Sequence, residues 1–147
     1  MSSVARAVFQ RVGERGKRAR MPNCATEGGS GYDIYTCDKI TIPAMQMRKI
    51  DLGFALQFSK NIVGLIKDRS GMAMKGLHIH AGVLDSDYWG EVGALAMNVT
   101  DKDITLEAGT RFAQIVFCAL VRPTIKEGTV SITERNPHGF ESSTGTK

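Results

Sequence analysis

Short runs in which apolar and polar residues alternate recur along the chain, with turn residues between them. Runs of this kind that are rich in β-branched and aromatic residues are typical of strands. The expected strands cover residues 4–12, 32–35, 39–42, 47–56, 62–67, 90–98, 104–106, 112–120 and 129–132. A convincing 3.6-residue apolar period is missing throughout, and only 71–77 could form a helical turn or two. The pattern therefore predicts an all-β protein.

The turn signals recur about every 8 to 12 residues, which favours a sandwich, jelly roll or small barrel over βαβ units. A chain of 147 residues suits one compact domain, and we expect that domain to cover residues 1–134. Residues 135–147 combine glycine, proline, serine and threonine with few apolar side chains. This composition predicts a mobile C-terminal tail.

Hydrophobic residues make up 42% of the chain and charged residues 23%, as in ordinary globular proteins. The longest apolar runs, such as 115–121, are too short to cross a membrane, and the N-terminus lacks the apolar core of a secretory signal. We therefore expect an intracellular protein, cytoplasmic or nuclear. The three cysteines match no zinc pattern, which predicts reduced thiols.

Positive charge is concentrated in residues 1–20, which carry six Lys and Arg side chains and one Glu. This segment has a net charge of +5, whereas the remaining residues sum to −1. A basic arm could bind nucleic acid through phosphates, but the segment lacks a series of aromatic residues interleaved with the cations. A solvated strand and loop near a polyanionic site is the favoured interpretation, so nucleic acid is not an expected partner.

The segment from Ala81 to Glu91, AGVLDSDYWGE, is the richest in candidate chemistry. It reads as a hairpin that presents Asp85 at its base, where a carboxylate beside Tyr88 could serve as a general base. The alternative is an acidic turn whose Asp side chains cap backbone amides.

The segment 67–76, KDRSGMAMKG, places cations, a hydroxyl and a glycine at a strand-to-helix turn. Such a turn can bind phosphate, or it can simply be a capped helix start with solvated charges. The tail segment 135–145 could order over a bound nucleotide or remain a disordered terminus. The segments 31–35 and 109–114 each hold a turn glycine that enters an alternating strand, and individually they indicate little.

In this order and spacing, the five segments resemble the five motifs of the trimeric dUTPase family, from about Gly28 to Gly145. The resemblance implies a jelly-roll-like β subunit assembled as a homotrimer with three shared active sites. It also implies hydrolysis of dUTP to dUMP and pyrophosphate with Mg²⁺, a step of nucleotide metabolism that supplies dUMP.

Carried onto this sequence, the resemblance makes Asp85 the base that activates the water attacking the α-phosphorus. Asp33 resembles the aspartate that orders waters around a Mg²⁺ ion chelated by the triphosphate. The remaining substrate contacts that it implies are Arg69, Ser70 and Gly71 on the phosphates and Gln114 near the attacking water.

Uracil recognition is implied for the main chain of the hairpin that precedes Asp85, at Ala81, Gly82, Val83 and Leu84. Tyr88 would pack under the deoxyribose and exclude a 2′-hydroxyl. The tail would close over the nucleotide as a flexible lid, with Phe140 stacking on the base. Its phosphate contacts would come from Arg135, Ser142, Ser143 and Thr144.

The sequence departs from the family pattern mainly in the tail, where Asn136 and Glu141 replace glycines and one residue is added near 142–143. Asp68 also replaces the usual proline before Arg69, and His80 stands where a smaller or apolar residue is usual. Two alternatives to an active dUTPase stay open. One is a dUTPase-like binding or regulatory protein with weak catalysis, and the other is a relative of the dCTP deaminases, whose chemistry needs a glutamate beside the base.

Overall fold

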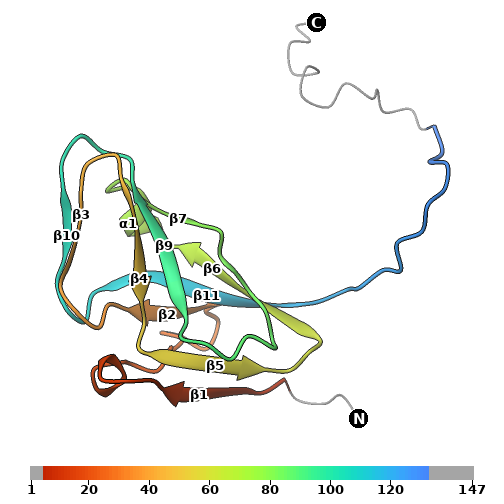
Figure 1. The fold of residues 1–147 in the computed structure, drawn as a ribbon, viewed down its shortest axis with the longest axis horizontal. Helices are drawn as coiled ribbons and strands as arrows, with labels where there is room; N and C mark the ends of the chain where they lie inside the picture. Colours follow the sequence, from red (N-terminus) through yellow and green to blue (C-terminus); the bar gives the residue numbers. More distant parts are fainter. Residues whose placement is uncertain (1–4, 133–147) are drawn as a thin grey trace, which may run out of the picture.

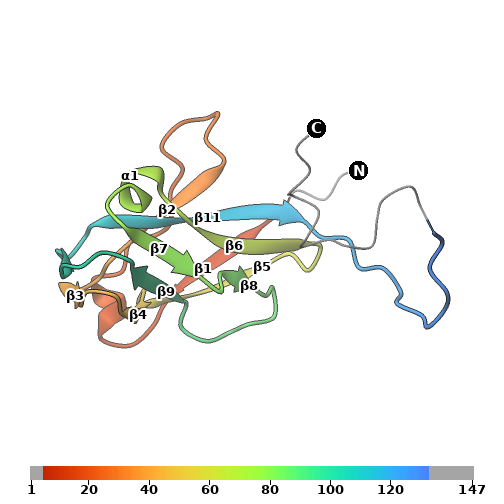
Figure 2. The ribbon, with the colours of Figure 1, turned by 90° about the horizontal axis from the view of Figure 1, so that it is seen from above.

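The structure, a computed structural model, describes residues 5–132 and forms two facing antiparallel sheets with two accessory ribbons (Figures 1 and 2). The four-stranded sheet has the order β2, β11, β6, β8. Its strands are Gly31–Tyr35 (β2), Arg111–Ala119 (β11), Ile62–Asp68 (β6) and Val83–Leu84 (β8). The long β11 lies between β2 and β6, so Gln114 is opposite Asp33 on one side and Lys67 on the other.

The three-stranded sheet has the order β4, β9, β7 and lies against the four-stranded sheet (Figure 2). Its strands are Met47–Asp51 (β4), Gly93–Asn98 (β9) and Leu77–His80 (β7). The ribbons pair Ala7–Arg11 (β1) with Phe54–Phe58 (β5) and Ile40–Ile42 (β3) with Ile104–Leu106 (β10). Helical structure in the described part is limited to Arg15–Lys17 (η1) and Ser70–Ala73 (α1), and neither is long enough to cross a membrane.

One hydrophobic core fills the space between the sheets. Every second residue of a strand points into this core. In β9, Ala94 and Ala96 are buried, whereas Leu95 and Met97 are only partly covered. The largest fully buried side chains are Phe54, Phe112, Ile34, Ile42, Leu52, Leu77, Ile115 and Val92. Period-two burial therefore fixes which face of each strand points inward.

The all-β class and most expected strands are confirmed, but three local expectations are wrong. The single strand expected over 47–56 is two strands, since Gly53 turns the chain with φ of +70° and passes close to the Arg15 main chain. β7 was missed, because its four residues run from buried Leu77 to exposed His80 without alternating burial. No strand forms over 129–132 in the described chain.

A long arm follows β11 and swings away from the body (Figure 1). Residues 121–132 are all exposed, including Val121, Ile125, Val130 and Ile132, whose relative exposures lie between 84% and 101%. A strand needs a partner for its backbone hydrogen bonds, and residues 5–132 supply none here, which explains the missing strand at 129–132. The predicted domain boundary at 134 lies outside the described residues.

Asn98, at the end of β9, is completely buried and has a full set of partners. Its amide Nδ2 donates to the carbonyls of Ile42, Pro43 and Lys102 at 3.0, 3.2 and 2.7 Å. Its Oδ1 accepts from the backbone N–H of Thr100 at 2.9 Å. One side chain thereby joins the end of β9 to the end of β3 and to the turn before β10.

Replacing Asn98 with alanine should lower the free energy of unfolding by about 2–4 kcal/mol, because several buried carbonyls lose their donor. The measurement is urea unfolding at one fixed protein concentration. The control is Thr105→Val, which removes only an exposed hydroxyl from its 2.9 Å contact with Thr41. Equal midpoints for both variants would contradict this account of Asn98.

Candidate active site

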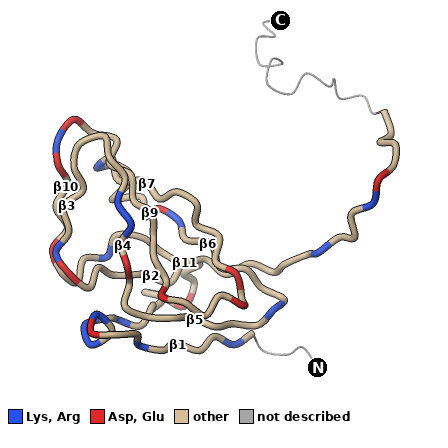
Figure 3. The backbone as a smooth tube through the Cα atoms, viewed as in Figure 1, with Lys and Arg blue, Asp and Glu red and all other residues tan. Residues whose placement is uncertain are grey.

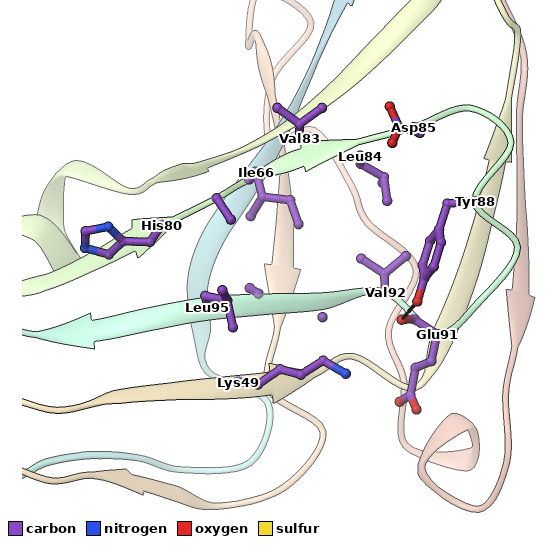
Figure 4. Close-up of a pocket in the computed structure, with 14 residues that line it drawn as sticks. Lys49, Ile66, His80, Val83, Leu84, Asp85, Tyr88, Glu91, Val92 and Leu95 are labelled. Carbon is purple, nitrogen blue, oxygen red and sulfur yellow. Dashed lines mark hydrogen bonds between the residues drawn. The ribbon is translucent and has the colours of Figure 1, made fainter.

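A cavity of about 330 Å³ opens between residues 80–85 and the start of β9 (Figure 4). Ala81, Gly82, Val83 and Leu84 line it, as does Asp85, so the structure brings these predicted site residues together. Leu84 is buried, whereas Val83 is 66% exposed. The cavity thus has an apolar wall that a planar ring could cover.

Two consecutive residues turn the chain within residues 80–85. Both have left-handed backbone angles, Ala81 with φ of +60° and Gly82 with φ of +73°. A Cβ at Gly82 would lie 2.5 Å from the carbonyl oxygen of Ile66 in β6. The backbone N–H of Ile66 donates to the Gly82 carbonyl at 2.7 Å. The backbone N–H of Val83 donates to the Ala81 carbonyl at 2.8 Å. Only glycine at 82 allows this close approach.

Asp85 and Tyr88 lie at the end of the cavity, on the loop between β8 and β9. Asp85 is exposed, and within the described residues its carboxylate has no hydrogen-bond or ion-pair partner. The Tyr88 ring is 46% exposed, and its hydroxyl donates to the Glu91 carbonyl at 3.1 Å (Figure 4). The exposed carboxylate of Asp85 therefore lines the same cavity as the ring of Tyr88, whose hydroxyl is held by a hydrogen bond.

Lys49 on β4 and Glu91 also line the cavity. Glu91 ends the segment 81–91 that the sequence singled out, but neither residue was among the predicted site residues. The Lys49 ammonium is 2.6 Å from Oδ1 of Asp51, and this hydrogen bond raises the pKa of Lys49. Glu91 accepts from the backbone N–H of Gly53 at 2.8 Å. Lys49 could not have been found from the sequence, because a lysine on an alternating strand is ordinarily a solvated residue.

A second group of predicted residues gathers around Asp33, which is buried in β2. The Nε of Arg69 lies 2.9 Å from Oδ1 of Asp33, and the Nη1 of Arg111 lies 3.2 Å from Oδ2. Arg69 Nη1 also donates to the Arg111 carbonyl at 3.3 Å. The guanidinium of Arg111 was missed, although it lies within the segment 109–114 that the sequence had singled out.

Gln114 belongs to this group through the backbone of Asp68. Its Nε2 donates to the Asp68 carbonyl at 2.8 Å, and its amide lies against Gly31, where an added Cβ would come within 1.9 Å of Oε1. The side chain of Asp68 faces β7, accepting from Ile79 N–H at 2.7 Å and lying 2.9 Å from the ring of His78. The unusual Asp68 thus ties the end of β6 to β7.

Ser70 and Gly71 begin the single turn α1, directly after Arg69, and both are exposed. Asp68 and the Asp85 loop lie at opposite ends of β6, since Leu84 pairs with Gly64 four residues before Asp68. At the usual strand rise this places the two groups about 13 Å apart along the strand. The predicted residues that the structure describes therefore form two separate groups, and Arg135, Phe140, Ser142, Ser143 and Thr144 lie outside the described residues.

The basic N-terminal segment is folded onto the body (Figure 3). Arg11 donates to the carbonyls of Gly16 and Ala19. Arg18 forms an ion pair with Asp38, and Lys17 forms one with Glu14. Arg15 forms ion pairs with both Asp38 and Glu91. Arg20 stacks over the ring of Tyr35. Most of these cations already have partners within the chain, as expected for a folded strand and turn.

Comparison with known proteins shows one consistent relationship. A family model described as dUTPase matches residues 17–144. The deoxyuridine 5'-triphosphate nucleotidohydrolase of Paramecium bursaria Chlorella virus 1 is 36% identical over 108 residues, which is 73% of this chain and 77% of that protein. The cowpox virus protein of the same name is 32% identical over 126 residues, covering 85% of this chain and 86% of its own length.

Solved structures share the fold. The Staphylococcus bacteriophage 80alpha dUTPase with dUpNHpp matches with a TM-score of 0.82 at 24% identity, covering 94% of this chain and 98% of that one. The dUTPase of phage phi11 of S. aureus, described with a structural Mg(II) ion, matches with a TM-score of 0.75 at 21% identity, covering 84% and 96%. This likeness confirms the jelly-roll-like β architecture.

The two glycines among the predicted site residues should respond differently to alanine. Gly82→Ala should lower the free energy of unfolding by about 2–4 kcal/mol, because the new methyl group meets a backbone carbonyl at a positive φ. Gly71→Ala should change it by no more than about 1 kcal/mol, because nothing lies within 4 Å of an added Cβ there. Urea unfolding of both variants is the measurement, and a neutral Gly82→Ala would contradict the described turn.

Proposed function

Because the chain belongs to the dUTPase family, we propose that it is a dUTP diphosphatase, hydrolysing dUTP to dUMP and pyrophosphate. The observation that carries the proposal is the cavity at residues 80–85, where the unpaired carboxylate of Asp85 lies beside the ring of Tyr88. A nucleoside seated against the apolar wall at Val83 and Leu84 would bring its phosphates past Asp85. The family relationship then assigns the reaction.

Asp85 is proposed as the general base. Its carboxylate takes a proton from a water molecule, and the water oxygen forms a bond to the α-phosphorus. The bond between the α-phosphorus and the bridging α–β oxygen breaks, so its electron pair leaves with pyrophosphate and dUMP remains. An aspartate is a weak base near neutral pH, so positioning and charge neutralisation must provide most of the acceleration.

The phosphate half-site is proposed to consist of Arg69, Ser70, Gly71 and Gln114. Arg69 is aimed by its ion pair with Asp33, and Gln114 is held by the Asp68 carbonyl. A guanidinium and exposed backbone amides at a turn suit the anionic triphosphate. Arg111, fixed by the second oxygen of Asp33, adds positive charge to the same group.

Mg²⁺ is proposed to arrive with the triphosphate rather than to reside in the protein. Among the described residues no group of three or more His, Cys, Asp or Glu could hold a metal. Both oxygens of Asp33 are engaged by guanidiniums, so Asp33 suits contact with metal-bound water better than direct ligation. The ion would neutralise charge on the phosphates when bound.

Selectivity for dUTP is proposed to reside in the turn within residues 80–85. The main chain of 81–84 would read the uracil edge, and its tight turn would leave no room for a 5-methyl group. The ring of Tyr88 would lie under the deoxyribose, where a 2′-hydroxyl would collide. Residues 135–147, which lie outside the described range, are proposed to close over the nucleotide, with Phe140 on the base.

We propose a homotrimer in which neighbouring subunits complete each site. The half-site at Asp85 and the half-site at Asp33 lie about 13 Å apart along β6, too far for both to serve one α-phosphate. The exposed apolar residues of the arm, 121–132, supply surface that a neighbouring subunit could bury. Assembly would explain both features together.

Asp85→Asn should keep the fold and dUTP binding but lower kcat by about 10² to 10⁴, the range expected when a general base is lost. The assay is pyrophosphate release from dUTP with Mg²⁺. The matched control is Asp87→Asn, an exposed carboxylate of the same loop, which should retain near wild-type turnover.

Near wild-type turnover of Asp85→Asn would remove Asp85 from the mechanism. A wild-type protein that binds dUTP without releasing pyrophosphate would instead favour a binding or regulatory role. Release of ammonia from dCTP would identify a deaminase.

Shared sites can be tested by mixing two inactive proteins, Asp85→Asn and Arg69→Ala. Light scattering should first give a mass near three times the 16.0 kDa chain. After joint unfolding and refolding, mixed trimers should regain about a quarter of wild-type activity, because some sites then combine an intact Asp85 with an intact Arg69. A mixture that stays inactive, or an active monomer, would contradict the proposal.

A further inference from the structure

The loop that carries Asp85 and Tyr88 is free at its tip and held at its base. Asp85, Asp87, Tyr88 and Trp89 are all exposed, and Trp89 is 87% exposed. Within the loop Tyr88 N–H donates to the Asp85 carbonyl at 3.2 Å, and main-chain hydrogen bonds to the body of the protein are found at the end of the loop. There, Leu52 N–H donates to the Val92 carbonyl at 2.9 Å, and Val92 N–H donates to the Phe54 carbonyl at 2.8 Å.

Glu91 lies near the end of the loop, directly before Val92, and its carboxylate is bound from two directions. The backbone N–H of Gly53 donates to Oε1 at 2.8 Å. The Nη1 of Arg15, in η1, lies 3.2 Å from Oε1 and 3.5 Å from Oε2, and this hydrogen bond raises the pKa of Arg15. Arg15 thus reaches across 76 positions of sequence to the base of the loop.

Tyr88 is the loop residue whose side chain contacts the backbone of Glu91. Its hydroxyl donates to the backbone carbonyl of Glu91 at 3.1 Å. Its ring lies so close to Gly90 that an added Cβ there would come within 2.5 Å of the hydroxyl. The orientation of the ring therefore depends on where the Glu91 backbone is held, and that position depends on the Glu91 carboxylate.

We infer that Arg15 is a positioning residue that fixes Tyr88 through Glu91 and thereby sets discrimination between 2′-deoxyribose and ribose. The inference rests on the proposed function, because Tyr88 is the residue expected under the sugar. Arg15 acts from outside the cavity, so it contacts neither the nucleotide nor the reacting atoms.

The alternative is that Arg15 only stabilises the N-terminal segment, since it also binds Asp38 at 3.3 Å and approaches Asp51 at 3.9 Å. Its side chain is 38% exposed, and partly exposed ion pairs contribute little to global stability. Loss of the guanidinium should therefore leave the fold intact and shift only the loop. A readout of selectivity separates the two roles.

The decisive comparison is Arg15→Gln against Arg18→Gln. Both arginines bind Asp38, and both lie at η1, but of the two only Arg15 contacts the loop. In Arg15→Gln, kcat/KM for dUTP relative to UTP should fall about five- to tenfold, mainly through a lower KM for UTP, because a small displacement of Tyr88 admits the 2′-hydroxyl. Arg18→Gln should keep the wild-type ratio.

Two further variants test the route through Glu91. Glu91→Gln should reduce the ratio as Arg15→Gln does, and the double variant should be no worse than either, since both changes break one connection. Arg15→Lys should restore part of the ratio. The single tryptophan, Trp89, provides a readout without turnover: its quenching by acrylamide should change in Arg15→Gln and not in Arg18→Gln.

Equal dUTP-to-UTP ratios in Arg15→Gln and Arg18→Gln would overturn the inference, as would additive losses in the double variant. Failure of the proposed function would appear differently, as a wild-type protein that releases no pyrophosphate from dUTP. The wild-type assay therefore separates the two failures.

Discussion

The Asp33 carboxylate, buried between two guanidiniums, is the contact on which the proposed phosphate half-site depends. Arg69 comes from the end of β6 and Arg111 from the start of β11, so one side chain of β2 joins three segments that are distant in sequence. A buried carboxylate without these partners would be strongly unfavourable. Charge neutralisation therefore fixes the arginine beside which a triphosphate would bind.

Sequence patterns predicted the strands in which buried and exposed residues alternate strictly. They failed where one backbone angle ends a strand, or where a strand would need a neighbouring strand to form. β9 could be predicted because Ala94, Ala96 and Asn98 alternate with partly covered residues. The break at Gly53 could not be read from alternation, since it follows from a positive φ and from the close passage of the Arg15 main chain. The arm at 129–132 has strand-like alternation but finds no partner strand within the part of the chain that the structure describes.

The candidate site was predictable in composition and less so in arrangement. Motif order placed Ala81 to Asp85 and Tyr88 in one segment, and the structure has them along one cavity. The hairpin expected there is wrong, because β8 pairs with β6 and β9 pairs with β4 and β7. Motif order did not indicate Lys49, because an isolated lysine on an exposed strand carries no pattern. Arg15 was noticed only as one of the six cations of residues 1–20, and nothing in that cluster distinguished it from the others. Motif order also did not indicate that Asp33 and Asp85 lie in two separate groups of residues. That separation follows from the antiparallel register of β6 and β8.

The exposed arm has a consequence for how activity would begin. In our proposal a single folded chain holds two incomplete half-sites and an uncovered apolar arm, so it has no means of turning over substrate alone. Activity would then follow the law of mass action, rising after a lag in a freshly diluted or newly synthesised population as chains meet. The concentration of the protein itself would serve as the first control on its catalysis.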